Sequence, residues 1–213
     1  MLLLIHCYAS EEQDEKLVLA RRGNRSELLD WLYIIRGSRS IFRDTWQYML
    51  NGPLSPILQE TIFPEHLAPA PENIEHSRRL NLLSAMPFAG MGNKSVSQTH
   101  TPKSTKSSQS PIPAALEALS NAFPKAQTAQ SHSVYTVCIA VRIWPAQVSS
   151  DYLALLKKND PAALILLAHY CILLEPFESS WYMHGFRRRL LLRIYNQLDP
   201  EWRHWVQWLM ESI

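Results

Sequence analysis

The sequence is poor in cysteine and lacks any pattern that would hold a metal ion or a disulfide framework. Its three cysteines, Cys7, Cys138 and Cys171, lie far apart among 213 residues and form no C-x-x-C pair. A disulfide-stapled secreted fold and a cysteine zinc site both need paired cysteines, so the spacing favours a reducing compartment. We expect these cysteines to be small buried side chains and expect no metal or other cofactor in this chain.

An excess of charge of one sign and a long apolar run are also missing. The formal net charge is +2, so no overall field favours nucleic acid. Residues 1–5 are apolar but too few for a signal peptide and without a basic flank. The longest apolar stretch, residues 162–174, is shorter than the roughly 20 residues of a membrane-spanning helix. We therefore expect no membrane span and no direct contact with nucleic acid.

Motifs typical of catalysis are absent as well. The run Gly92-Asn93-Lys94-Ser95 resembles only the end of a phosphate-binding loop, and no strand pattern precedes it. The histidines show no H-E-x-x-H spacing, and no G-x-S-x-G elbow is present. We predict no catalytic, metal-binding or DNA-binding residue and hence no enzyme. A cofactor-free enzyme using His169 or His184 as acid or base is the less favoured alternative.

What the sequence does contain is helical periodicity, which predicts an all-α antiparallel helical array. Residues 134–143 are rich in β-branched side chains and would also suit a strand, so only their context favours a helix. Ser149 or Ser150 and Asp160-Pro161 are expected helix starts, whereas Gly37 and Glu175-Pro176 are expected helix ends. The predicted helices cover residues 26–36, 38 or 40 to 51, 53–59, 72–85, 114 onward, 134–143, 149 or 150 to 159, 162–174 and 178–198.

A change of composition divides the chain. Residues 90–113 are rich in Ser, Thr, Lys, Gly and Pro and contain no acidic residue. Such a segment buries too little apolar surface to offset its chain entropy, so we predict a disordered linker. The predicted organisation is an N-terminal helical part (1–87), the linker (88–113) and a C-terminal helical part (114–213).

The last segment of the chain carries three tryptophans, Trp202, Trp205 and Trp208, after Asp199-Pro200. Asp and Pro are favoured at a helix start, so the indoles should share one face of a short helix that seals a core. The one basic cluster, Arg187-Arg188-Arg189 with Arg193, is expected to form a solvated helix face.

Six short patterns follow one another along the chain. They are an L-D-W-L-x-x-x-R-G run at residues 29–37, a G-P-L-x-P turn at 52–56, a W-P pair at 144–145, a D-P-x-A-L-x-x-L-A-H-Y helix at 160–170, a Trp-containing helix at 181–198 and a D-x-x-W-x-x-W ending at 199–208. In this order they resemble the regulatory domain of fungal zinc binuclear cluster transcription factors, nearest to the branch of the sterol uptake control proteins.

The resemblance implies a helical, ligand-responsive module of a factor that controls RNA polymerase II transcription in the nucleus, or in the cytoplasm before activation. By resemblance, a small apolar molecule such as a sterol would bind beside His169, Tyr170, Trp181 and Tyr182, and related factors would form homo- or heterodimers with the chain. The family binds DNA through an N-terminal six-cysteine cluster holding two zinc ions, which this sequence lacks. We therefore expect a regulatory part that begins after the start of the family domain, either as a truncated chain or as a short relative.

A second interpretation stays open. An incomplete helical array should leave an apolar face exposed, and such a face predicts a partner. The chain would then be a non-enzymatic interaction protein that pairs with a full-length factor.

Overall fold

The computed structural model describes residues 30–53, 55, 74–85, 110–130, 134–179 and 183–212. Within these residues the chain forms helices and turns and no strand, which confirms the all-α prediction. The elements are α3 (Asp30–Leu50), α5 (Ile74–Ser84), α6 (Pro111–Gln130), α7 (Val134–Gln147), α8 (Ser150–Lys157), α9 (Pro161–Tyr170), the 3-10 helix η2 (Cys171–Phe177), α10 (Phe186–Gln197), the 3-10 helix η3 (Pro200–Trp205) and α11 (Gln207–Glu211).

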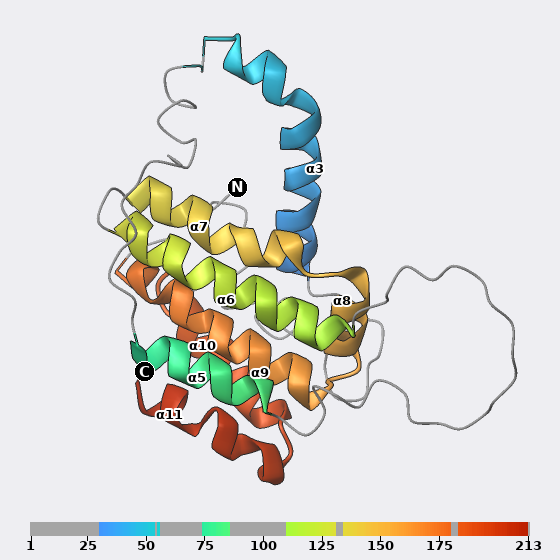
Figure 1. The fold of residues 1–213 in the computed structure, drawn as a ribbon, viewed down its shortest axis with the longest axis vertical. Helices are drawn as coiled ribbons and strands as arrows, with labels where there is room; N and C mark the ends of the chain where they lie inside the picture. The colour runs from blue at the N-terminus through green and yellow to red at the C-terminus, as the bar shows by residue number, and fades with distance from the viewer. Residues whose placement is uncertain are drawn as a thin grey trace, which may run out of the picture.

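Most helices pack into one body, and α3 extends out of it. Figure 1 shows α6 and α7 side by side and antiparallel, with α9, α10 and α5 beneath them and α11 at the opposite edge from α3. The first turns of α3 pack on α7, and the rest of α3 projects away from the body (Figure 1). Among the described elements, α3 therefore joins the core by its N-terminal end.

The helix α9 is the centre of the core. Every residue from Ala162 to Tyr170 is buried, as expected for a helix that is apolar on all sides. Both predicted caps are present: Ser149 Oγ accepts from the Tyr152 backbone N–H at 3.1 Å, and Asp160 Oδ1 accepts from that of Ala163 at 3.1 Å. These caps fix where α8 and α9 begin.

Two predicted helix ends are wrong. The helix α3 continues through Gly37, because this glycine keeps a right-handed conformation; of the described glycines, Gly185 alone has a positive φ, 71°. After α9 the chain tightens into the 3-10 helix η2 and passes through Pro176 to Phe177, because a short 3-10 turn tolerates the proline that an α-helix interior would not.

Three further boundaries differ from the prediction. The expected helix over residues 178–198 begins only at Phe186, because Gly185 turns the chain immediately before it. The helix α6 begins at Pro111, three residues before the expected start at Ala114. The ambiguous segment 134–143 is helical, as predicted, and its helix α7 runs on through Pro145 to Gln147. Most of the predicted linker and the expected helix at 53–59 lie outside the described residues.

The three C-terminal tryptophans do pack on the core, but from two short helices instead of one. Trp202 and Trp205 belong to η3, and Trp208 belongs to α11. Asp199 makes no side-chain cap to η3. Among the described residues, no single helix is long and apolar enough to cross a bilayer. The helix α8 and the continuous α9–η2 segment reach the required length and apolar character only when taken together, and the two are bent by 108° relative to each other.

Candidate functional site

An aromatic cluster with Tyr170 at its centre is formed by side chains of α3, α7, α8, α9 and α10. The Tyr170 ring stacks on Trp144, with ring centroids 4.8 Å apart, and on Trp31, with centroids 6.1 Å apart. Phe186 meets Trp31 edge to face at 5.8 Å, and Tyr152 meets Trp144 edge to face at 5.6 Å. Stacked and edge-to-face pairs at these distances are the favoured arrangements of aromatic rings. We call these five residues the Tyr170 cluster.

The polar atoms of this cluster bond to backbone carbonyls, with one exception. Tyr170 donates to the Val141 carbonyl at 3.1 Å, Tyr152 donates to that of Ala163 at 2.8 Å, and Trp144 Nε1 donates to that of Ala115 at 2.8 Å. The indole Nε1 of Trp31 is buried and has no hydrogen-bond partner among the residues that the structure describes. A buried donor without an acceptor is rare and costs about 1–3 kcal/mol, so Trp31 marks the polar end of the cluster.

Burial also determines the protonation of the cluster. Removal from solvent raises the pKa of Tyr170, and the same effect raises the pKa of Tyr152. Both phenols stay neutral and act as hydrogen-bond donors. The cluster is therefore a buried, uncharged aromatic group with one N–H that has no acceptor among the described residues.

His169 is next to Tyr170 in the sequence but contacts other elements. Its Nδ1 lies 2.9 Å from the Ile165 carbonyl, and its ring meets Trp208 at 5.7 Å between centroids. The guanidinium of Arg79 lies over the ring of Trp208, with its central carbon 3.8 Å from the ring centroid. The side chains of α5, α9 and α11 are thereby joined in one Arg79–Trp208–His169 stack.

The His169 imidazole is kept neutral by its surroundings. Desolvation lowers its pKa from 6.5 to about 4, opposed by the hydrogen bond to Ile165 and reinforced by the charge of Arg79. A neutral imidazole bonded to a carbonyl through Nδ1–H is a packing group and a poor proton donor near neutral pH. The next residue, Cys171, is buried, and desolvation raises the pKa of its thiol, so it stays protonated.

Of the four predicted ligand-pocket residues, the structure describes two. His169 and Tyr170 are both buried, but they belong to separate aromatic groups. Trp181 and Tyr182 lie outside the described residues. Sequence reasoning did not select Trp31, although the L-D-W-L run contains it, because its approach to Tyr170 depends on how α3 packs. Nothing in the local sequence marks Arg79 as a partner of Trp208.

The prediction of a solvated arginine face is wrong for one residue. Arg188 is exposed, whereas Arg187 is buried and its Nη2 donates to Ser212 Oγ at 3.0 Å. The reason is its position: Arg187 lies three, four and seven residues before the buried apolar side chains on the inner face of α10, which are Leu190, Leu191 and Ile194.

Within the described part of the chain, no group of three or more His, Cys, Asp or Glu side chains is arranged to hold a metal ion. No family model, curated protein or solved structure matches the chain.

Proposed function

We propose that the chain is a ligand-responsive regulatory module of a fungal-type transcription factor that controls RNA polymerase II transcription in the nucleus, without a DNA-binding zinc cluster of its own. The observation that carries the ligand part is the buried, unpartnered Nε1 of Trp31 beside Tyr170. A small apolar molecule with one hydroxyl or carbonyl oxygen, such as a sterol, would satisfy this donor and lie against aromatic rings.

The resemblance supports the regulatory part, because the residues that carry it hold the core together. Trp144 of the W-P pair and Tyr170 of the D-P helix stack on each other, and Asp160 of the same motif caps α9. Trp31 of the L-D-W-L run stacks on Tyr170 from the other side. A motif order made of mutually packed residues is what a shared fold would produce, and fold alone does not assign the ligand.

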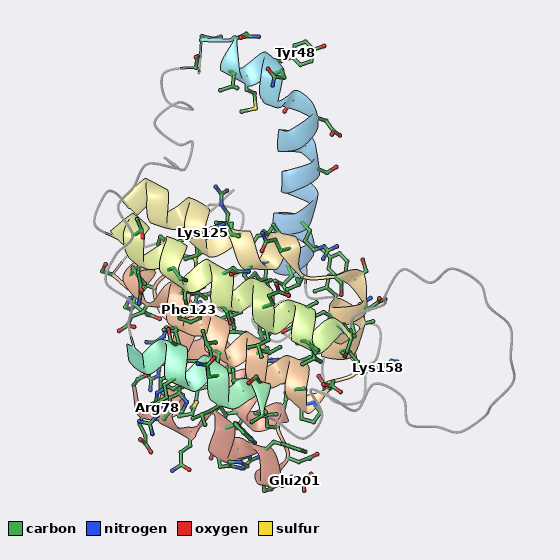
Figure 2. The ribbon with its side chains drawn as sticks, viewed as in Figure 1. Tyr48, Arg78, Phe123, Lys125, Lys158 and Glu201 are labelled. Atoms are coloured by element: carbon green, nitrogen blue, oxygen red, sulfur yellow. The ribbon has the colours of Figure 1, made fainter. Side chains whose placement is uncertain are left out.

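The attachment of α3 suggests how occupancy would be transmitted. Trp31, Leu32 and Ile35 are buried, and Arg36 donates to the Val148 carbonyl, so the start of α3 is anchored to the body. Tyr48, at the far end of the same helix, is exposed and away from the body (Figure 2). In our proposal, a ligand at Trp31 shifts the anchored end and thereby the direction of the projecting end.

Transcription from a reporter tests the proposal. The chain is fused to an unrelated DNA-binding domain in yeast, and reporter output is compared between sterol-replete and sterol-depleted cells. We expect a several-fold change in output with wild type. Trp31→Phe should lose most of that change, because it removes the indole N–H and keeps an aromatic ring.

Trp205→Phe is the matched control, since Trp205 is a partly exposed indole of η3 that packs on the core and makes its ring contact with His204. It should respond like wild type. If a folded, nuclear wild-type fusion gives the same output with and without sterol, the ligand-responsive proposal fails. A response that Trp31→Phe leaves intact would place the ligand elsewhere.

A second candidate is an interaction protein without a ligand, favoured by the exposed apolar residues of α3. Ile41 is 66 % exposed and Tyr48 is 82 % exposed, and seven residues separate them, so they lie on the same side of the helix. A related factor would cover this side by packing one of its helices along α3.

Association of differently tagged copies of the chain tests this candidate, with the chain standing in for a related factor. Wild-type copies should co-purify, and the double variant Ile41→Glu/Tyr48→Glu should not, because charge on this face would be desolvated in the complex. Gln47→Glu adds charge to the same exposed turn of α3 but about 100° away from Tyr48, and it should associate like wild type. Monomeric wild type at all concentrations would speak against self-association through α3.

A further inference from the structure

Arg187 is a buried cation whose charge is not matched by its described neighbours. The side chain is 6 % exposed, although it lies in the first turn of α10. Its Nη2 donates to Ser212 Oγ at 3.0 Å, and its Nε is buried and has no hydrogen-bond partner among the described residues. No carboxylate among the described residues forms an ion pair with this guanidinium. A neutral hydroxyl is thus the one partner that the described structure provides.

Such an arrangement is unusual, because buried arginines are normally paired. A guanidinium removed from water is strongly destabilised unless an anion or several acceptors replace its hydration. Nε–H and one Nη2–H of a guanidinium point in the same direction and form a fork that fits two oxygens of one oxyanion. In Arg187, Nη2 donates to Ser212, and Nε donates to no group in the part of the chain that the structure describes.

The surroundings favour an anion of high charge. Arg188 and Arg189 follow Arg187 directly, and the first turn of α10 contains no acidic residue. The helix also begins at Gly185 without a side-chain cap, so its N-terminus adds a partial positive charge. Glu178 reduces this potential, since its Oε2 accepts from the Gly185 N–H at 3.3 Å.

Ser212 provides the way in from solvent. The residue is exposed, and its hydroxyl donates to the Leu209 carbonyl at 2.8 Å while it accepts from Arg187. Rotation of this small side chain releases the Nη2 prong without disturbing the core. An incoming oxyanion would then accept from Nε and Nη2 together.

We propose that the Arg187 fork, gated by Ser212, is a binding site for a phosphate-class oxyanion. The ligand is inorganic phosphate or the phosphate group of a small phosphomonoester, which share a doubly charged group whose oxygens fit the Arg187 fork. The site is independent of the sterol response proposed above, because it uses none of the residues of the Tyr170 cluster.

Thermal unfolding of the whole chain tests the site. Inorganic phosphate, glycerol 3-phosphate and acetate are titrated separately, with sodium chloride added to keep the ionic strength constant. We expect phosphate at about ten times its Kd to raise Tm by about 3–6 °C and acetate to raise it less. A larger effect of glycerol 3-phosphate than of phosphate would identify a phosphomonoester as the preferred source. No rise with either phosphate compound would overturn the proposal.

Three variants locate the effect. Arg187→Gln should abolish the phosphate-dependent rise, whereas Arg188→Gln, which removes the same charge from the adjacent exposed position, should keep most of it. Ser212→Ala removes the group that competes for Nη2, so phosphate should bind it several-fold more tightly. A rise that persists in Arg187→Gln contradicts the site. If Arg187→Gln does not fold, an unchanged Kd in Ser212→Ala contradicts the gated fork.

Discussion

At the scale of single residues, burial decides what the polar side chains of the core do. Tyr170 and Tyr152 are fully buried phenols that each donate to a backbone carbonyl of another helix, so they act as hydrogen-bonded packing groups. His169 is a neutral donor within its own helix. Trp31 differs, because its donor has no acceptor. This difference makes Trp31 the residue at which an added ligand would gain most.

The buried His169 predicts how stability changes with pH. Its pKa is about 4 in the folded chain and 6.5 when exposed, so the unfolded chain takes up the proton first as pH falls. His169 therefore contributes stability that is present above pH 6.5 and is lost progressively down to pH 4, by about 3 kcal/mol in total. Denaturant unfolding at several pH values measures this, with His169→Gln as comparison.

The free energy of unfolding of His169→Gln should fall less steeply over this pH range than that of wild type. His184→Gln is the control, because His184 is exposed, and its curve should follow wild type. Parallel curves for wild type and His169→Gln would show that His169 is not buried as a neutral imidazole.

At the scale of helices, the residues that cap a helix start could be predicted from the sequence. Whether a helix continues past a glycine or a proline could not. Ser149 and Asp160 act within three residues of their own position, so local sequence is enough to identify them. Whether a helix stops at Gly37 or passes Pro176 depends on what its flanking turns gain from packing. The turn at Gly185 was missed because a glycine inside a helical pattern does not reveal the sign of its φ.

The two glycines Gly37 and Gly185 should respond in opposite ways to alanine. A Cβ at Gly37 would meet no atom within 4 Å, so Gly37→Ala should stabilise the chain by about 0.5–1 kcal/mol through helix propensity. Gly185 has φ of 71° and a Cβ there would lie 3.0 Å from Arg189 Nη1, so Gly185→Ala should destabilise by about 1 kcal/mol. Chemical denaturation measures both changes. A destabilising Gly37→Ala would mean that α3 is not continuous at this residue.

At the scale of the whole molecule, α3 is a long helix that is fixed at one end. Its first turns reach Tyr170 and Phe186, and its last turns carry the exposed Tyr48 (Figure 2). This arrangement connects the Tyr170 cluster to the exposed apolar side chains of α3 through one continuous helix. The ligand proposal and the interaction proposal are thus two uses of the same helix.

The aromatic contacts between distant parts of the chain set the limit of sequence reasoning. The all-α class and the buried α9 follow from composition and periodicity, which are local properties. His169 and Tyr170 were selected because they lie on that helix, yet their ring partners Trp208, Trp144 and Trp31 come from three other elements. Which tryptophan meets which residue depends on helix packing angles, and a single sequence does not specify these.

Sterol binding to the purified chain tests the central claim most directly. Thermal unfolding is followed by tryptophan fluorescence while a solubilised sterol is titrated into wild type, Trp31→Phe and Trp205→Phe. We predict that sterol raises the Tm of wild type and of Trp205→Phe, by about 2–4 °C for each kcal/mol by which the bound sterol stabilises the folded chain. The rise in Trp31→Phe should be markedly smaller. An unchanged Tm in wild type at saturating sterol, or an equal rise in Trp31→Phe, would contradict it.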